Sequence, residues 1–274
     1  MTLTAEDRAV LSKVPAVTLG FWIIKILATT LGETGGDAVT MTWLGETGPN
    51  AGASGVSGYL IGTAIFLVPL IVLAIAQIAA KRFHPLLYWA TIIASTTAGT
   101  TMADFADRSL GIGYTGGSAL LLACVLASLG AWRATLGSVD VNRIATPRAE
   151  SFYWLTITFS QTLGTALGDW AADDGGLGYL GGAAVFGGAL AVLALLYYGT
   201  RISRVALFWV AFILTRPLGA TVGDFLDKPL AKGGLDLSRP IASLALTAAI
   251  LILILVLPQR AGGHPGAQPA GVPA

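Results

Sequence analysis

Four aspartates mark equivalent points in four similar stretches of the chain. They are Asp37, Asp104, Asp169 and Asp224. In a helix, the residues three, four, seven and eight positions before each aspartate lie on the same face as the aspartate itself. In the first three stretches this face is polar, and it includes Glu33 and the equivalent threonines Thr30, Thr97 and Thr162. The fourth stretch departs from the pattern and carries Arg216 on the approach to its aspartate.

Carboxylates and hydroxyls in this arrangement are suited to binding a hard cation or protons. Such oxygen ligands favour magnesium, calcium, manganese, sodium or a proton over copper or zinc. If the four aspartates converge, their mutual repulsion keeps some of them protonated until a cation binds, and the group titrates as one coupled set. A set of this kind can exchange protons for cations. The residues do not choose among these ions.

Two basic residues lie within the apolar stretches and need partners there. Lys25 and Arg216 each precede a carboxylate of the same stretch, Glu33 and Asp224, by eight residues. Eight helical residues rise about 12 Å, which is too far for direct pairing. We therefore expect the counter-charges on neighbouring repeats, either as a structural ion pair or as part of a gate.

The aspartates belong to a unit that the chain repeats four times. The repeats align without a gap from Phe21, Tyr88, Tyr153 and Phe208. In each repeat a tryptophan follows this aromatic residue, a glycine comes ten residues after the tryptophan, and the aspartate comes fifteen after it. The tryptophans are Trp22, Trp89, Trp154 and Trp209, and the glycines are Gly32, Gly99, Gly164 and Gly219.

The repeated residues also have purely structural interpretations. Fifteen residues of helix rise about 22 Å, so the tryptophan and the aspartate of one repeat mark opposite membrane interfaces. We interpret the tryptophans mainly as an aromatic belt at the headgroup level, with stacking against a cofactor or substrate as the alternative. The threonines can bond between helices, and the glycines let backbones approach. The four carboxylates fit this interpretation less well, because an ionisable group near hydrocarbon is costly.

Composition places the repeats in a membrane. The chain is 54% hydrophobic and 11% charged, with a net charge of +1, which excludes an ordinary soluble domain and a nucleic-acid partner. One cysteine and two histidines cannot form a zinc or iron cluster, and we expect no cofactor. Eight segments are long and apolar enough to span a bilayer. Their ranges are 15–36, 56–80, 86–106, 114–133, 150–171, 178–199, 204–226 and 238–258.

The distribution of charge predicts the orientation of these spans. Ten lysines and arginines fall on the side of the termini and four on the other side, which also carries ten acidic residues. The positive-inside rule therefore places both termini in the cytoplasm. The acidic outer mouth can concentrate cations, although solvation alone also explains it. The tail over 259–274 has little to bury, and we predict that it is disordered.

Two spans per repeat give successive repeats the same orientation. The sequence thus predicts an all-α polytopic membrane protein with a single transmembrane domain over 1–258, built from repeats at about 15–80, 86–133, 150–199 and 204–258. The eight helices form four parallel two-helix repeats with pseudo-symmetry about the membrane normal. A ring of four repeats and two paired halves are both compatible with this pattern.

The repeat pattern resembles a family of bacterial membrane proteins that are built from four tandem two-span repeats, each with a tryptophan. Its members are classed as repeat-containing, membrane-anchored proteins of unknown function. The resemblance covers almost the whole chain. It implies a multi-pass protein of the bacterial inner membrane and supplies no substrate.

Three classes of function fit the residues. We favour a transporter or exchanger of a small cation or proton, in which Glu33 and the four repeat aspartates line the outer half. A pseudo-tetrameric channel is the alternative within transport, although no re-entrant pore segment is evident. A non-transporting scaffold or sensor, with the lipid bilayer as its main partner, is the alternative outside transport. Four equivalent aspartates suit a repeat better than a catalytic dyad, so we expect no enzyme. The oligomeric state is open.

Overall fold

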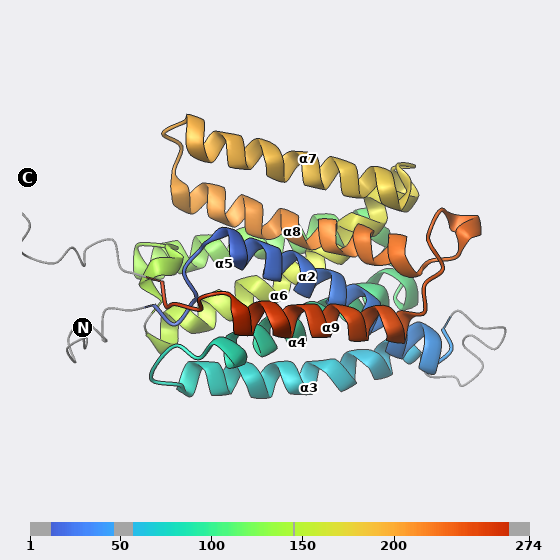
Figure 1. Cartoon of the computed structure of the whole chain (residues 1–274), viewed down its shortest axis with the longest axis horizontal. Helices are drawn as coiled ribbons and strands as arrows, with labels where there is room; N and C mark the ends of the chain where they lie inside the picture. The colour runs from blue at the N-terminus through green and yellow to red at the C-terminus, as the bar shows by residue number, and fades with distance from the viewer. Residues whose placement is uncertain (1–11, 47–56, 145, 263–274) are drawn as a thin grey trace, which may run out of the picture.

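The computed structural model describes residues 12–46, 57–144 and 146–262, and its regular elements there are helices. Eight α-helices follow one another along the chain (Figure 1). They are α2 (Leu19–Asp37), α3 (Gly58–Ala79), α4 (Pro85–Asp104), α5 (Gly113–Leu136), α6 (Pro147–Asp169), α7 (Gly178–Gly199), α8 (Arg204–Asp227) and α9 (Arg239–Val256). Each begins and ends within four residues of a predicted span. The all-α fold is confirmed.

Local signals begin and end the helices that carry the repeat aspartates. Thr18, Thr146 and Ser203 cap α2, α6 and α8, because their side chains accept a hydrogen bond from a backbone amide of the first turn. Pro85 begins α4, where the amide hydrogen that proline lacks would have no partner. At the other end, a π-helical turn starts directly after the aspartate of each of the first three repeats. These turns are η1 (Ala38–Trp43), η2 (Phe105–Ser109) and η4 (Trp170–Asp174).

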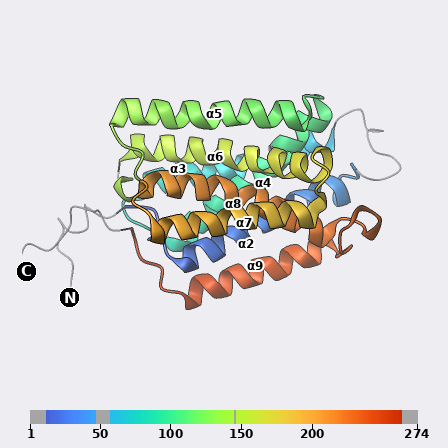
Figure 2. The same cartoon turned by 90° about the horizontal axis from the view of Figure 1, so that it is seen from above.

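The first helices of the four repeats form a closed ring. Helix α2 packs against α4, α4 against α6, α6 against α8, and α8 against α2. The second helices surround this ring, with α3 on α4, α5 on α6, α7 on α8 and α9 on α2 (Figures 1 and 2). The outer helix of each repeat therefore packs on the inner helix of the next repeat, and the outer helix of the last repeat packs on the inner helix of the first. These are the contacts of a ring rather than of two paired halves.

The repeat glycines lie where neighbouring inner helices cross. A side chain on any of them would collide with a residue of the next inner helix. The colliding pairs are Gly32 with Thr96, Gly99 with Gln161, Gly164 with Arg216, and Gly219 with Thr29. All four partners stand seven positions after the tryptophan of their own repeat, so the same contact recurs around the ring. The predicted role of the glycines in close helix packing is confirmed.

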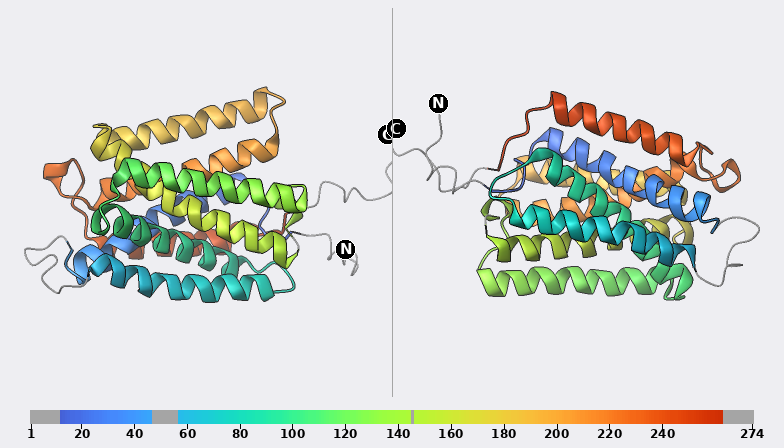
Figure 3. Two further views of the ribbon diagram at one scale, coloured as in Figure 1. Left: turned by 180° about the vertical axis from the view of Figure 1, so that it is seen from behind. Right: turned by 90° about the horizontal axis from the view of Figure 1, so that it is seen from below.

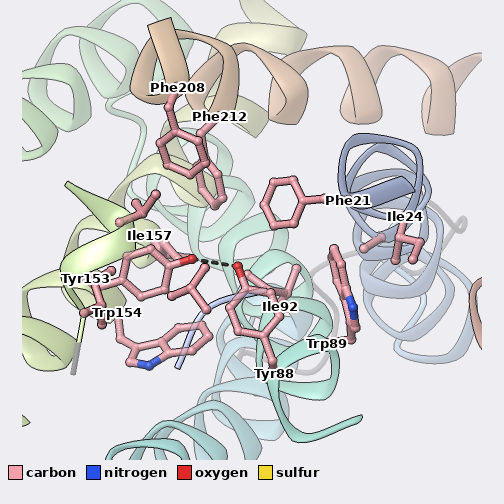
Figure 4. Packing of buried hydrophobic residues seen from close by; sticks show 14 of the residues in the cluster. Phe21, Ile24, Tyr88, Trp89, Ile92, Tyr153, Trp154, Ile157, Phe208 and Phe212 are labelled. Carbon is pink, nitrogen blue, oxygen red and sulfur yellow. Dashed lines mark hydrogen bonds between the residues drawn. The ribbon is translucent and has the colours of Figure 1, made fainter. Parts of the chain in front are cut away.

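An aromatic cluster fills the tryptophan end of the ring. The aromatic residue before each tryptophan contacts the tryptophan of the next repeat. The ring centroids are 5.5 Å apart for Phe21 and Trp89, 5.8 Å for Tyr88 and Trp154, 6.2 Å for Tyr153 and Trp209, and 5.7 Å for Phe208 and Trp22. The hydroxyls of Tyr88 and Tyr153 are hydrogen-bonded at 2.6 Å inside the cluster (Figure 4).

This cluster corrects the interpretation of the tryptophans as a headgroup belt. Trp89, Trp154 and Trp209 are at most 4% exposed, and only Trp22 is partly exposed. The rings turn inward because the polar side chains of the inner helices gather at the aspartate end, which leaves the tryptophan end to be filled by apolar volume. Stacked and edge-on aromatic pairs suit that space.

The outer surface of the bundle is apolar. Val68, Leu126, Leu195 and Leu255, on α3, α5, α7 and α9, are 59 to 76% exposed. Among the described residues, α3, α5, α7, α8 and α9 are long and apolar enough to cross a membrane. Helices α2, α4 and α6 fall short because they carry the threonines and carboxylates that the ring buries. The views from behind and below show the helices running alongside one another (Figure 3).

The two ends of the described chain meet near the aromatic cluster. The Ser12 amide donates to the Gly262 carbonyl at 3.0 Å, and the indole of Trp89 donates to the Gln259 side chain at 3.1 Å. The prediction of disorder from 259 onward is therefore wrong for 259–262, because these residues find partners in the amino-terminal segment and on α4. The rest of that tail, 263–274, lies outside the described residues.

Candidate functional site

Arg216 lies inside the inner ring and bonds to all three of the other inner helices. Its Nη2 donates to Glu33 Oε2 at 2.9 Å, to Thr100 Oγ1 at 2.6 Å and to Thr165 Oγ1. Arg216 is fully buried. Glu33, Thr100 and Thr165 each stand eleven positions after the tryptophan of their repeat, and Ala220 holds that position in the fourth. The expected partner of Arg216 on another repeat is therefore confirmed, and it is Glu33.

The four repeat aspartates converge in two pairs, and each pair shares one cation. Lys228 Nζ lies 2.5 Å from Asp37 Oδ2 and 2.9 Å from Asp224 Oδ1. Arg108 Nε lies 3.0 Å from Asp104 Oδ1, and its Nη2 lies 3.3 Å from Asp169 Oδ2. All four aspartates are at most 3% exposed. The polar stripes of the sequence thus end in one buried, charged layer.

Lys228 and Arg108 belong to this charged layer, although the sequence interpretation left them in the outer loops. Each stands four residues after a repeat aspartate, which is one helical turn and the ordinary spacing of an ion pair within a helix. That four-residue spacing is the feature of the sequence that could have identified both residues as partners of the aspartates. Met41 and Asp173 hold the same position in the first and third repeats.

A cavity of about 490 Å³ opens over this charged layer. Met41, Arg108, Asp173 and Lys228, the residues four after each repeat aspartate, all line it. The wall also carries all four of the basic residues that the sequence places on the outer side, together with four aspartates. The expectation of a simply acidic mouth is therefore wrong for this cavity, because the few outer cations gather there.

The charged groups at the floor of the cavity hold Lys228 in its protonated form. Burial lowers the pKa of Lys228, but the carboxylates of Asp224, Asp37 and Asp227 outweigh burial and raise the pKa well above its usual range. The neighbouring Asp107, in η2, behaves differently. Burial raises its pKa to about 6 against the opposing effect of Arg108, and neither of its carboxylate oxygens has a hydrogen-bond partner in the described part of the chain.

Three carboxylates lie close enough together to hold one metal ion. One oxygen each from Glu33, Asp37 and Asp224 lies within 4.8 Å of the others. Oxygens that bind Ca²⁺ at 2.3 to 2.6 Å stand at most about 5 Å apart, so this spacing suits a hard cation. Asp37 Oδ1 is buried without a hydrogen-bond partner in the described part of the chain. Arg216 and Lys228 already touch these carboxylates, so an entering cation must share or displace them.

The structure does not bring every predicted site residue to this layer. The hydroxyls of Thr30, Thr97 and Thr162 donate to carbonyls four residues earlier on their own helices, at 2.8 to 3.0 Å. Thr100 and Thr165 approach the charged groups instead. Lys25 lies deeper, and among the described residues it has no carboxylate partner. The expectation of a counter-charge for Lys25 on a neighbouring repeat is therefore not met within the part of the chain that the structure describes.

Comparison with known proteins identifies the repeats and supplies no activity. A family model described as a Repeat of Unknown Function (DUF347) matches residues 20–83, 87–137, 152–203 and 207–260. These ranges follow the four predicted repeats, and the resemblance seen in the sequence is confirmed. No curated protein matches the chain, and no solved structure does.

Proposed function

This chain belongs to that repeat family of unknown function, and from its site we propose that it is a multi-pass membrane protein that exchanges a small hard cation for protons. The exposed apolar side chains of the outer helices support the membrane location, because such a surface is rare on a soluble monomer. Polar inner helices are compatible with that location because the ring shields them from lipid. The bias of basic residues supports an inner-membrane protein with both termini in the cytoplasm.

We further propose that all eight helices span the bilayer and that the four repeats surround a pseudo-fourfold axis along the membrane normal. Three recurring contacts support this arrangement. The glycine crossings, the aromatic pairs and the packing of each outer helix on the next inner helix all pass from one repeat to the next and close on the first.

The balance of buried charge carries the proposal of cation exchange. Five carboxylates of the inner helices, Glu33 and the four repeat aspartates, share three cations, Arg108, Arg216 and Lys228. The cluster is therefore two negative charges in excess when every group is ionised. Buried charge without compensation is strongly unfavourable, so two protons or one divalent cation must make up the difference. Proton loss and cation binding are then linked at one site.

The geometry supports a route to and from that site. A cation enters through the cavity and meets Asp224 and Lys228, which line its wall. It binds among Glu33, Asp37 and Asp224 and loosens Lys228 from the last two. The aromatic cluster closes the opposite end of the ring, so release to that side requires the cluster to part. An exchanger needs its site to be closed to one side of the membrane while it is open to the other, whereas a channel needs a continuous open path.

The test is uptake into proteoliposomes that contain a pH-sensitive dye. Sodium, potassium, magnesium, calcium and manganese are supplied in turn to the wild type, Asp37→Asn and Asp224→Asn. Asp174→Asn is the matched control, because Asp174 is exposed and lies outside the cavity wall. We expect one ion to drive proton movement in the wild type and the control, and at least tenfold less in the two site variants.

Two results would contradict the proposal. The first is that no ion of the panel moves protons although the reconstituted protein is folded; this result would favour a scaffold or sensor. The second is a current that flows without saturation and without proton movement; this result would favour a channel.

A further inference from the structure

Lys25 is a buried lysine at a position that the other repeats fill with apolar side chains. It stands three residues after Trp22, where the other repeats have Ile92, Ile157 and Phe212. Lys25 and these three residues are fully buried. The first repeat has thus placed an ionisable group in the apolar layer between the charged site and the aromatic cluster.

The surroundings of Lys25 are suited to a neutral amine. Its Nζ has one hydrogen-bond acceptor, Thr215 Oγ1 at 3.3 Å, and lies 4.1 Å from the centre of the Phe212 ring. An ammonium group carries three donors, and a phenylalanine face at a buried site compensates for only a small part of its lost hydration. No carboxylate among the described residues pairs with Lys25.

A charged group on a helix packed against α2 also opposes a second positive charge at Lys25. Helix α2 packs against α4, α8 and α9. Helix α8 brings Arg216 next to Thr215, and its positive charge repels an ammonium at Lys25. Helix α4 has only Tyr88 and Asp104 at its two ends, and α9 has only Arg239 at its first residue. On α2 itself, Glu33 is two turns away and bonded to Arg216, and Asp37 lies one turn further and is bonded to Lys228. The remaining charged groups of α8 are Arg204 at its first residue and Asp224 and Asp227 near its end, which pair with Lys228 and Arg239.

We propose that Lys25 carries one of the two coupling protons: its amine is neutral while a cation occupies the carboxylate site, and it takes up a proton when the cation leaves. This inference rests on the proposed exchange function and names one of the groups that hold these protons. Lys25 and Glu33 are about 12 Å apart along α2. At that distance and an effective dielectric constant of about 20, one unit charge changes the affinity for another about tenfold, and a divalent cation changes it about a hundredfold.

The first experiment separates cation movement from proton movement in proteoliposomes. The variants are Lys25→Met and Lys25→Arg, and Ile92→Met is the matched control at the same position of the second repeat. Isotope exchange of the transported cation reports on the carboxylate site, and the dye counts protons per cation. We expect Lys25→Met to keep isotope exchange within a few fold and to move one proton fewer per cation than the wild type. Lys25→Arg, which stays charged, should bind the cation at least tenfold more weakly.

The second experiment needs no variant protein to transport. The chain has five lysines, so side-chain ¹⁵N NMR of the wild type in detergent can follow each amine, with Lys25→Met used only for assignment. We expect a neutral amine at Lys25 near pH 7 with cation present and a charged one after its removal.

The outcomes distinguish this inference from the proposed function. Absence of isotope exchange in the wild type overturns both. Isotope exchange together with an unchanged proton count in Lys25→Met, or with an amine that stays charged when cation is bound, overturns the role of Lys25 alone.

Discussion

Substituting either member of the Arg216–Glu33 pair should lower the free energy of unfolding, and the two losses should depend differently on pH. Both side chains are at most 3% exposed and are 2.9 Å apart. In Arg216→Met the orphaned Glu33 can take up a proton. For a carboxyl group with an ordinary pKa of about 4.3, this uptake costs about 3.7 kcal/mol at pH 7 and about 1.4 kcal/mol less for each unit of acidification. The electrostatic loss in this variant therefore cannot exceed about 3.7 kcal/mol at pH 7 or about 2.3 kcal/mol at pH 6.

When the carboxylate is removed instead, the remaining charge cannot be neutralised by a change in protonation. In Glu33→Gln the guanidinium of Arg216 stays charged at every accessible pH, and a buried charge that loses its partner costs about 3 to 5 kcal/mol. We expect Glu33→Gln to lose that amount at both pH 6 and pH 8. The double variant Arg216→Met/Glu33→Gln removes both charges, so it should be more stable than Glu33→Gln alone.

The assay is the free energy of unfolding in mixed detergent micelles, measured at pH 6, 7 and 8 for the wild type and the three variants. Arg204→Met is the control, because Arg204 is an exposed arginine on the same helix and its loss should cost less than about 1 kcal/mol. Equal, pH-independent losses in the two single variants would refute the reasoning, and so would a double variant that is less stable than Glu33→Gln.

Three further predictions concern the ring, the aromatic cluster and the rim of the cavity. Gly99→Ala places a Cβ 2.9 Å from the Gln161 backbone and should cost about 1 to 3 kcal/mol in the same unfolding assay, whereas Gly188→Ala, with open space around it, should be neutral or stabilising by up to about 1 kcal/mol. Trp154→Ala should cost about 3 to 5 kcal/mol, far more than Trp43→Ala, because Trp43 is 68% exposed. Asp107→Asn should remove part of the loss of stability that the wild type shows as pH rises from 4 through 6. A carboxyl whose folded pKa is raised to about 6 destabilises the fold as it ionises, so an unchanged difference in melting temperature between pH 5 and pH 7 would contradict this assignment.

The sequence predicts the helices and places the four aspartates at equivalent ends of their helices, because both depend on local spacing. Their convergence stays a condition in the sequence analysis, since it depends on how the repeats pack. The intervals from tryptophan to glycine and from tryptophan to aspartate place these residues on successive turns of one helix. The same spacing gives Glu33, Thr100 and Thr165 one shared position in their repeats. Only the structure shows that they form a layer, because Arg216 contacts all three. The role of the glycines also follows from the sequence, since a small residue on one helix face predicts a close crossing.

The remaining features depend on how the repeats associate, which local spacing does not determine. Closure into a ring follows from the packing of α8 and α9 on α2, between helices that lie near the two ends of the chain. The tryptophans face inward because four aromatic pairs meet at one end of that ring, and a single repeat gives no sign of this. Arg108 and Lys228 each form an ion pair with an aspartate of their own repeat and another with an aspartate of a different repeat. Only the pairing within a repeat, at a spacing of four residues, is visible in the sequence.

The central claim is that the buried carboxylate site carries two negative charges in excess, which two protons compensate until one hard cation replaces them. The most direct measurement is proton release in weakly buffered detergent solution as each cation of the panel is titrated into purified protein, together with the amount of cation bound. We predict that one cation binds saturably to the wild type and releases up to two protons, that Asp37→Asn binds it at least tenfold more weakly, and that Lys228→Met, which lacks the competing ammonium, binds it more tightly. Folded wild-type protein that neither binds a cation of the panel nor releases protons would contradict the claim.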